Sequence, residues 1–422
     1  MTEQNRIRNE IQDKAVLLSL KNDKLLLQFA TGVGKSLAAL KIIKAAIMAG
    51  DFRVWHIVVW ESKHIKNWND DIIKHDMEDI LQYVHIYCYA SLKSQATGDV
   101  NYICDEGHHM FGDVAWEHLT NNVAYRLLVL TATLSADKLK ILKQEYPDLV
   151  RYSISLSEAI RLELLPKPNI YVIPVGFDNT VAKYEIVITK GAKAKWEKLP
   201  QTVCNYGQHW QYLKGATVVN LKIMATAAQA LSHYNSAVEY NKNLFIKNRQ
   251  DYQKVRWLQS GTVRKRFLAE VKTDIARGLD TRLRALNMRK IVFCGSVDQA
   301  IELGEKKNTI HSRITTKQSQ EIVNNFNDLK ITELYTNKMA REGMNLELIQ
   351  LGVIIQLDAE SLGFIQMMGR VLRANNPHIF ILVAQGTQDD KYFNSSTLGI
   401  DLDLFSDYRE FFKLYENGKS TV

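Results

Sequence analysis

The segment FATGVGKS at residues 29–36 combines residue types that can bind the phosphates of a nucleotide. It overlaps the end of an apolar run at 25–30 and opens an amphipathic stretch at 35–50. A strand, a glycine-rich loop and a helix in this order form a phosphate-binding loop, whereas a glycine turn without this context would carry little meaning. Gly32 and Gly34 let backbone N–H groups approach the phosphates, and the start of the helix adds a partial positive charge.

The side chains of this loop predict a site for ATP and Mg²⁺. Lys35 is expected to neutralise oxygens of the β- and γ-phosphates, and the Ser36 hydroxyl is expected to bind Mg²⁺. The predicted ATP-binding residues of the loop are Thr31, Gly32, Val33, Gly34, Lys35 and Ser36.

Two acidic residues follow another apolar run, in the segment YICDEGHH at residues 102–109. Strands of a parallel sheet bring such residues to one edge, beyond their carboxyl ends, where ligands bind. Asp105 is therefore expected to bind Mg²⁺ together with Ser36, and Glu106 to orient or deprotonate the attacking water. His108 and His109 lack a third histidine or cysteine nearby, so the sequence gives little support to a metal site there.

Apolar runs of strand length recur along both halves of the chain, separated by helical patterns. In the first half they lie at 25–30, 54–60, 84–90, 101–106 and 126–132. In the second half they lie at 169–175, 290–296, 331–336, 352–357 and 378–384. Buried strands that alternate with helices indicate parallel sheets covered on both faces. The sequence predicts two α/β domains in tandem, connected by residues 134–168.

Composition narrows the class of protein. The chain has 422 residues, of which 46% are hydrophobic and 24% charged, which is typical of a globular protein of two or three domains. No apolar run reaches membrane-spanning length, and the polar start does not resemble a signal peptide. The four cysteines form no CxxC pair; they are Cys88, Cys104, Cys204 and Cys294. We expect a cytoplasmic protein with reduced thiols, in a bacterial cell or a phage-infected host, with no membrane association.

Positive charge is concentrated in one segment. Residues 181–290 hold 21 Lys and Arg against seven Asp and Glu, an excess of 14, whereas the rest of the chain has a net charge of −6. Few apolar strand patterns occur within 195–288, so this range is predicted to be a basic helical insertion. The predicted division is residues 1–150 for the first domain and residues 151–194 with 289–422 for the second.

The most basic stretch of the insertion is RQDYQKVRWLQSGTVRKR at residues 249–266. Its predicted nucleic-acid contacts are Arg264, Lys265 and Arg266, because guanidinium and ammonium groups bind phosphates. A solvated helical face is the alternative. Trp257 has two interpretations, a ring that stacks on an exposed base or an anchor inside the insertion.

The motifs of the first half resemble those of superfamily 2 helicases and translocases. FATGVGKS is similar to motif I, DEGH to the DEAH-type motif II, and Thr131-Ala132-Thr133 to motif III, which couples hydrolysis to the nucleic-acid track. IQDKAV (11–16) is similar to the region that senses adenine, which implies a role for Gln12. VVWESKHIKNW (58–68) is similar to motif Ia, which contacts the nucleic-acid backbone and nominates Lys63, and YASL (89–92) is similar to the next such segment.

The second half continues the resemblance. KIVFCGS (290–296) is similar to motif IV and TNKMAREGMNL (336–346) to motif V, which implies that Gly343 and Asn345 lie at ATP. QMMGRVLR (366–373) is similar to motif VI, whose arginines reach across the cleft to the γ-phosphate. That role falls to Arg370 and Arg373, and a coupling role to Gln366. The resemblance implies two RecA-like domains, with the insertion in the second.

Departures from the common motifs refine the prediction. Phe29 replaces a small residue, Met367 stands where many relatives carry arginine, and Asn345 replaces an aspartate. These forms are closest to the Swi/Snf branch, which moves along duplex DNA, whereas the size and layout are similar to small phage-type branch-migration helicases. We expect a monomeric, ATP- and Mg²⁺-dependent helicase or translocase that acts on duplex or branched DNA in recombination or repair. An RNA helicase, a motor subunit of a restriction or defence complex, and a non-translocating ATP-gated clamp remain open alternatives.

Overall fold

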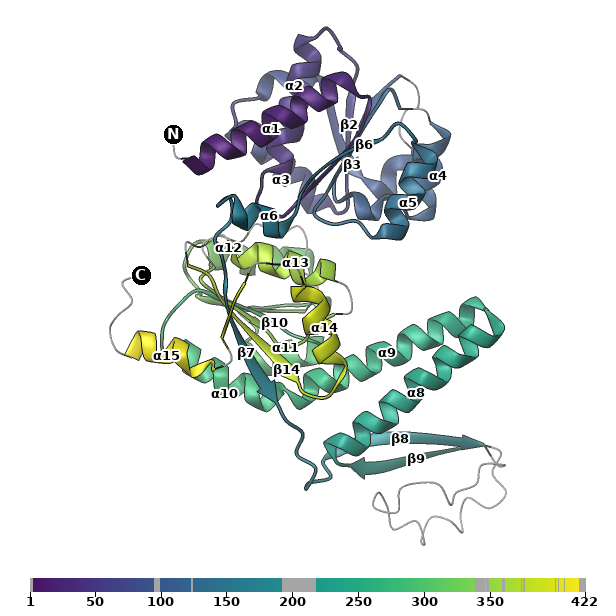
Figure 1. The fold of residues 1–422 in the computed structure, drawn as a ribbon, viewed down its shortest axis with the longest axis vertical. Coiled ribbons are helices and arrows are strands. Elements are labelled where there is room, and N and C mark those ends of the chain that lie inside the picture. Colours follow the sequence, from purple (N-terminus) through teal and green to yellow (C-terminus); the bar gives the residue numbers. More distant parts are fainter. Residues whose placement is uncertain are drawn as a thin grey trace.

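The computed structural model describes residues 3–94, 99–122, 124–191, 218–337, 346, 349–358, 361–372, 374, 376–398, 400, 402–405 and 407–416. Two parallel sheets, each covered by helices, stand one above the other in Figure 1. This arrangement confirms the predicted fold class of two tandem RecA-like α/β domains. Among the described residues, no helix is both long and apolar enough to cross a membrane.

The first domain is a parallel sheet with strand order β3-β2-β4-β5-β1-β6. Its strands are β1 (Lys24–Phe29), β2 (Trp55–Val59), β3 (Val84–Cys88), β4 (Asn101–Cys104), β5 (Arg126–Thr131) and β6 (Val150–Ile154). Its helices are α1 (Glu3–Lys21), α2 (Lys35–Met48), α3 (Ser62–Lys74), α4 (Asp113–Asn121) and α5 (Ala136–Glu145), with short 3₁₀ turns at Glu78–Tyr83, Tyr89–Ser94 and Gly107–His109. Helices α1 to α3 pack on one face of the sheet, and α4 and α5 pack on the other.

The predicted boundary at residue 151 is wrong, because β6 belongs to the first sheet. Strand β6 pairs in parallel with β1, from Leu25 beside Val150 to Phe29 beside Ile154. It is an edge strand with only its last residue buried, so its sequence VRYSI lacks the continuous apolar run by which the central strands are recognised. The chain then crosses to the second domain through α6 (Leu156–Arg161).

The second domain is a parallel sheet with strand order β11-β12-β10-β13-β14-β7-β15. Its strands are β7 (Asn169–Val175), β10 (Lys290–Phe293), β11 (Thr309–Ile310), β12 (Glu333–Thr336), β13 (Leu351–Ile354), β14 (His378–Ala384) and β15 (Asp403–Phe405). Its helices are α10 (Thr273–Arg284), α11 (Val297–Leu303), α12 (Thr316–Asn327), α13 (Ser361–Val371), α14 (Gln388–Thr397) and α15 (Arg409–Glu416). Helices α12 and α13 pack on one face, and α10, α11 and α15 on the other.

A long excursion separates β7 from β10. It contains the antiparallel strands β8 (Tyr184–Gly191) and β9 (Val218–Ala225), followed by α8 (Ala227–Asn248) and α9 (Asp251–Val271). We call α8 and α9 the arm; the two helices run side by side and project away from the second sheet (Figure 1). The predicted range 195–288 therefore needs two corrections. It includes a β-strand, and it includes α10, whose Leu279 and Leu283 lie in the core of the second domain.

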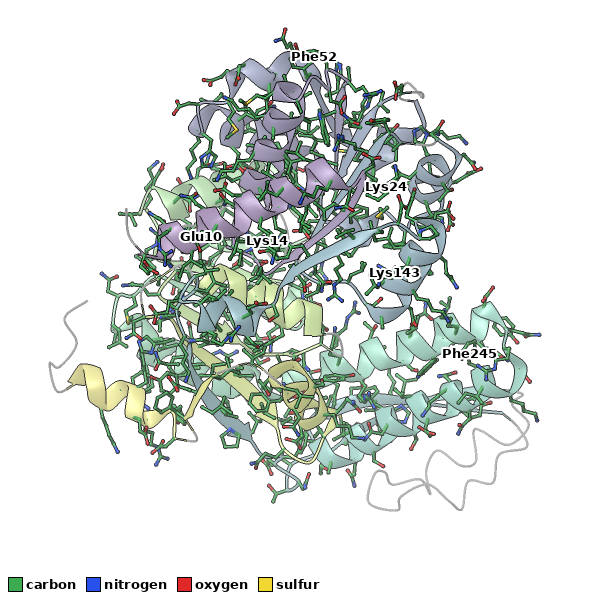
Figure 2. All side chains as sticks on the ribbon, turned by 45° about the horizontal axis from the view of Figure 1, so that its top comes forward. Glu10, Lys14, Lys24, Phe52, Lys143 and Phe245 are labelled. Atoms are coloured by element: carbon green, nitrogen blue, oxygen red, sulfur yellow. The ribbon has the colours of Figure 1, made fainter. Side chains whose placement is uncertain are left out.

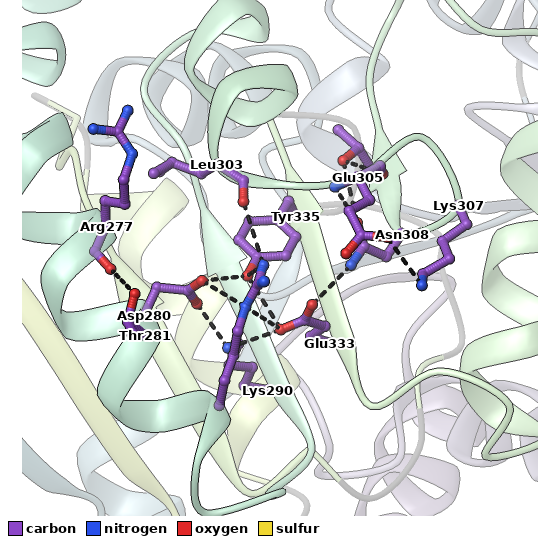
Figure 3. Close-up of polar contacts among 12 residues, drawn as sticks. Arg277, Asp280, Thr281, Lys290, Leu303, Glu305, Lys307, Asn308, Glu333 and Tyr335 are labelled. Carbon is purple, nitrogen blue, oxygen red and sulfur yellow. Dashed lines mark hydrogen bonds and ion pairs between the residues drawn. The ribbon is translucent and has the colours of Figure 1, made fainter.

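Part of the predicted basic excess is structural and does not reach the surface. Lys290 is buried at the start of β10, where its Nζ lies 2.7 Å from Asp280 Oδ1 and 2.9 Å from Glu333 Oε2. Arg284 Nε lies 3.0 Å from Asp280 and 3.1 Å from Glu333, and Tyr335 completes the cluster shown in Figure 3. Lys272 and Arg289 are buried as well. Lys290 and Lys272 are paired with buried carboxylates, and Arg289 donates to the carbonyl of Phe326, so these three cations are not available to a polyanion. Arg284 is paired as well, but its side chain is 40% exposed.

Candidate active site between the two domains

A cleft of about 1230 Å³ lies between the two domains. Its walls include most of the residues predicted to bind ATP or catalyse its hydrolysis, namely Thr31, Gly32, Gly34, Lys35, Ser36, Asp105, Glu106 and Arg370. The first seven follow the carboxyl ends of β1 and β4, as the parallel topology predicts. Arg370 comes from α13 of the second domain.

The turn after β1 depends on glycine. Gly32 has a φ of 93° and Gly34 a φ of 101°, both in the left-handed region that side chains disfavour. A Cβ on Gly34 would also lie 2.7 Å from Nε2 of Gln12 on α1. The predicted role of Val33 in binding ATP stays a prediction; its side chain is fully buried in the core, and its N–H donates to the carbonyl of Ala30 at 3.2 Å.

Lys35, the first residue of α2, lines the cleft. Its Nζ donates a hydrogen bond of 3.1 Å to the carbonyl oxygen of Phe29. Burial lowers the pKa of Lys35; the carboxylates of Glu106 and Asp105 oppose this change, and the nearby Arg370 guanidinium adds to it. The two acids and the two bases thus act on one another in one site, although they come from different domains.

Asp105 is held by a residue that the sequence analysis missed. Its Oδ2 accepts a hydrogen bond of 2.9 Å from Nε1 of Trp68 on α3, and its Oδ1 accepts one of 2.9 Å from the N–H of Glu106. Burial, and next the charge of Glu106, raise the pKa of Asp105. Two adjacent carboxylates that line the same cleft as Ser36 offer the hard oxygen ligands that Mg²⁺ prefers, and a cation there would offset the cost of burying the negative charge.

Glu106 adopts a backbone conformation that is rare for its residue type. Its φ is 45°, and the next residue must be glycine, because a Cβ on Gly107 would lie 2.3 Å from Val129 Cγ1 of β5. One carboxylate oxygen, Oε2, lies 3.6 Å from His108 Nδ1. Strained backbone held by tight packing is common where a catalytic group must point in one direction.

His108 and His109 have contacts that do not involve a metal. No group of three potential metal-ligating side chains occurs among the described residues. The His109 ring stacks on Trp60, with centroids 3.9 Å apart and planes 6° apart, and the two histidine rings lie 4.1 Å from each other. Trp60, at the end of β2, was not singled out from the sequence.

Gln12 lies behind the glycine turn beside Gly34 and is not among the residues that line the cleft. The side chain is 1% exposed, and neither its Oε1 nor its Nε2 has a hydrogen-bond partner among the described residues. An amide can donate to and accept from the edge of adenine, and the adenine-binding role of Gln12 stays a prediction. Gln4 and Arg8, on the same helix, line the cleft and donate to the carbonyl of Leu164 at 3.0 and 3.2 Å; they too were missed.

The second wall of the cleft docks closely on the first. Arg370 is 8% exposed, and a Cβ on the preceding Gly369 would lie only 2.6 Å from Cβ of Thr31. Met367, which stands in place of an arginine, is fully buried in the core. Among the other predicted residues, Gly343, Asn345 and Arg373 lie outside the described residues, and Gln366 is on α13 but its side chain is not described.

The predicted coupling residues of the first domain lie at the end of β5. Thr131 is fully buried, and its Oγ1 donates to the carbonyl of Thr133 at 2.7 Å. The Thr133 hydroxyl is buried and has no hydrogen-bond partner in the part of the chain that the structure describes. It can therefore accept or donate a hydrogen bond in another state of the protein.

The predicted nucleic-acid contacts are spread over two places. Lys63 pairs with Glu61 at 2.6 Å and lines a groove of about 680 Å³ between α3 and α12, which includes Lys317 and Gln320. On the arm, Arg266 is exposed and Arg264 donates to Asn235 at 3.1 Å.

Two further expectations for the arm meet different outcomes. The role of Lys265 as a nucleic-acid contact stays a prediction, and in this structure its ammonium pairs with Asp358 of the second domain. Trp257 stacks on Phe245 of α8 with ring centroids 5.9 Å apart. This contact joins the two arm helices and favours the interpretation of Trp257 as an anchor inside the insertion.

Comparison with known proteins supports the assignment of the second domain. Residues 273–375 match the family model described as the helicase conserved C-terminal domain. The match begins at α10 and ends beyond α13, so it includes the helix that carries Arg370. No curated protein matches the chain by sequence.

Solved structures with a similar fold cover nearly the whole chain. S. cerevisiae Dbp5 bound to RNA and ADP BeF3 is 11% identical over 96% of this chain and 92% of that chain, with a TM-score of 0.58. A substituted form of Dbp5 with the same ligands covers 97% of this chain and 93% of that chain at 11% identity, with a TM-score of 0.59. The Pyrococcus furiosus Hef helicase domain is 14% identical over 93% of this chain and 97% of that chain, with a TM-score of 0.48. At these identities the Dbp5 similarity establishes the two-domain fold.

Proposed function

We propose that this chain, whose second domain contains a helicase conserved C-terminal domain, is an ATP-hydrolysing nucleic-acid motor of superfamily 2. The observation that carries the proposal is the meeting of Lys35, Glu106 and Arg370 in one cleft between two RecA-like domains. Phosphoryl transfer is accelerated mainly by positioning and by charge stabilisation, and this cleft can supply both from opposite sides of the nucleotide.

Each side chain has a distinct part in the proposed reaction. Lys35 holds the β- and γ-phosphate oxygens, and Glu106 orients the attacking water and takes up its proton. Asp105 and Ser36 would hold Mg²⁺, which when bound neutralises charge on the phosphate oxygens. Trp68 keeps the Asp105 carboxylate in place, and Gln12 would recognise adenine with its buried amide.

Arg370 makes hydrolysis depend on the relative position of the domains. A guanidinium stabilises the charge on the transferred phosphoryl group only when it lies within contact distance. Because α13 packs against Thr31 through Gly369, any separation of the domains withdraws Arg370 from the cleft. Cycles of closure and opening, driven by ATP binding and hydrolysis, would then move the two domains along a nucleic acid.

The proposed substrate is duplex or branched DNA, on which the protein acts as a helicase or translocase in recombination or repair. Support comes from the Swi/Snf-like forms of motifs II, V and VI in the sequence and from the exposed basic side chains of the arm. The Dbp5 structures contain RNA, but their likeness to this chain concerns the fold. Unwinding and ATPase assays with forked, four-way and blunt DNA, each beside its RNA equivalent, distinguish these substrates.

The catalytic assignment is tested by Lys35→Ala and Glu106→Gln. We expect Lys35→Ala to lose nucleotide binding, because the phosphate charge is no longer balanced. Glu106→Gln should bind ATP normally and hydrolyse it about 10² to 10⁴ times more slowly, because only the handling of the water is removed. Fluorescent-nucleotide binding and phosphate release measure the two effects, with exposed Arg313→Ala as a control. Equal loss of nucleotide affinity in both variants would contradict the assignment.

A further inference from the structure

The base of the arm is wedged between two strand ends of the second sheet. Gly295 follows β10, and a Cβ at this position would lie 2.4 Å from Cβ of Ala269 on α9 and 2.9 Å from Cβ of Gln356, which follows β13. Gln299 ties the same place together, because its Nε2 donates to the carbonyl of Ala269 at 2.6 Å and its Oε1 accepts from the N–H of Gly295 at 2.8 Å. The arm therefore cannot shift at its base without moving these strand ends.

A buried ion pair strengthens the contact with the segment after β13. Lys272, at the end of α9, is fully buried and pairs with the buried Asp389 of α14. Its Nζ also donates to the carbonyl of Ile355 at 2.9 Å and to Gln356 Oε1 at 3.0 Å. The Gln356 amide in turn donates to Asp389 Oδ1 at 2.7 Å. A buried charge with this many partners fixes the geometry of all of them, since losing any one leaves an uncompensated group.

A second ion pair joins the arm to the same segment farther along α9. Lys265 pairs with Asp358, and both side chains are mostly buried, at 19% and 17% exposure. Lys265 and Lys272 are seven residues apart, two helical turns, and so lie on the same face of α9. Residues 355–358 are thus held by α9 at two points, a short distance in sequence before α13, the helix that carries Arg370.

The arm itself is built to move as one body. Its helices pack along their length and are joined near the far end by the stack of Phe245 on Trp257, and Figure 2 shows Phe245 out on the arm, away from both sheets. Helix α9 has 21 residues, which corresponds to a length of about 30 Å. Exposed basic side chains lie toward the far end; they include Lys247, Arg249, Lys254 and Arg256.

From these contacts we propose that residues 355–358 transmit the state of the arm to Arg370, with Lys265 and Lys272 as positioning residues. The inference rests on the proposed function. When the far end of the arm engages a nucleic acid, α9 shifts, and the two lysines carry the shift to the segment that leads into α13. Arg370 then takes its place at the γ-phosphate, so nucleic-acid binding on the arm raises the rate of ATP hydrolysis. Lys265 acts in this coupling and not as a phosphate contact.

The variant Asp358→Asn tests the inference cleanly, because Asp358 carries no positive charge that could bind a phosphate. We expect ATPase without nucleic acid, and the affinity for a fluorescent DNA duplex, to stay within about twofold of the parent. Stimulation of ATPase by saturating DNA should fall at least about fivefold, the lower end of typical coupling between sites. Lys265→Asp should lose stimulation as well, and the charge-swapped double variant, Lys265→Asp with Asp358→Lys, should recover most of it.

A matched control is Lys222→Asp, which breaks the exposed pair of Lys222 with Glu185 in the hairpin at the foot of the arm, at 3.0 Å. It should leave stimulation unchanged. Full stimulation of Asp358→Asn, or no rescue in the double variant, would overturn the inference. A weakened DNA affinity of Lys265→Asp that the double variant does not restore would instead make Lys265 a nucleic-acid contact. If the parent hydrolyses no ATP at a rate above Lys35→Ala, the proposed function itself fails, independently of the arm.

Discussion

The two walls of the cleft hold their charged side chains in different ways. In the first domain, the charged side chains come directly after the ends of strands, and tightly packed turns fix their positions. Gly32, Gly34 and Glu106 adopt left-handed conformations, and Gly107 has no room for a Cβ. In the second domain, Arg370 lies on α13, and the segment 355–358 before this helix is bound to the arm.

This difference suggests a division of labour between the walls. The first wall is preorganised, because moving its charged groups would require rebuilding turns that are packed against β5 and α1. We expect the second wall to withdraw as a unit, because Arg370 is carried by one helix, α13, which meets the phosphate loop where Gly369 approaches Thr31. A motor needs both properties: a fixed site for ATP and a catalytic group whose presence depends on the track.

The strongest test of the movable wall is Arg370→Ala. We expect the turnover number to fall by about 10³ or more, the scale of an arginine finger, with little change in nucleotide affinity, because the guanidinium acts on the transition state. Arg373→Ala is predicted to behave in the same way. Steady-state ATPase with DNA and fluorescent-nucleotide titration separate the two quantities. Turnover at the parent rate in either variant would remove that residue from the catalytic set.

Gly369→Ala probes the contact between the walls without removing a charge. The added methyl group would lie 2.6 Å from Thr31 Cβ, so the domains must move apart. A displacement of this size is expected to reduce turnover about tenfold to a hundredfold. Gly278→Ala on α10 is the matched control, because its Cβ meets open space; it should keep full activity and gain about 0.5–1 kcal/mol of stability. Equal turnover in both variants would show that the contact does not limit closure.

We expect acid to destabilise both domains, because each has a buried histidine in its core. The pH dependence of unfolding therefore allows the two cores to be compared. Burial, with smaller contributions from His85 and His118, lowers the pKa of His56 in the first domain to about 4. Burial lowers the pKa of His378 in the second domain to about 4 as well. Both rings stay neutral in the folded protein while the unfolded chain binds protons below about pH 6.5. Their contribution to stability is therefore complete above pH 6.5 and is lost progressively as the pH falls toward 4.

The measurement is thermal unfolding between pH 7.5 and 4.5 for the parent, His56→Gln and His378→Gln. Each variant should be less stable at neutral pH but show a shallower loss with acid than the parent. Gln82→Ala, at an exposed position with no titratable group, serves as the control and should follow the parent curve. A variant curve parallel to that of the parent would mean that the ring is not the group that titrates.

The sequence predicts the first wall better than the second for a physical reason. Buried parallel strands are continuous apolar runs, and the residues after them must share one edge of the sheet. The sequence alone therefore predicts that four side chains lie close together, those of Lys35, Ser36, Asp105 and Glu106. Trp68 could not, because a tryptophan on an amphipathic helix is usually a core residue, and only the fold reveals its hydrogen bond to Asp105.

Charge counting was less successful in the second domain. A sum over residues 181–290 treats every lysine and arginine as exposed, whereas Lys272, Arg289 and Lys290 are buried among partners from distant parts of the chain. The partner of Lys265 is 93 residues away in sequence, so no local sequence pattern could predict this ion pair. Edge strand β6 was misassigned for a related reason, since its pattern is half polar.

The smallest expected effect concerns the arm as a surface for nucleic acid. With Lys265 assigned to Asp358, the predicted phosphate contacts of this stretch are Arg264 and Arg266. Replacing both by alanine should weaken DNA binding modestly and reduce the slope of log affinity against log salt by up to about 0.9 per lost contact on duplex. ATPase without DNA should not change, because neither residue lines the cleft.

Arg282→Ala and Arg313→Ala together remove the same charge elsewhere on the second domain and provide the control. Fluorescence titration at several salt concentrations gives the slopes. If the arm variant and the control both match the parent slope, Arg264 and Arg266 are solvent-exposed side chains of α9 that do not contact DNA. The nucleic acid must then contact the protein elsewhere, and the groove beside Lys63 is the next place to test.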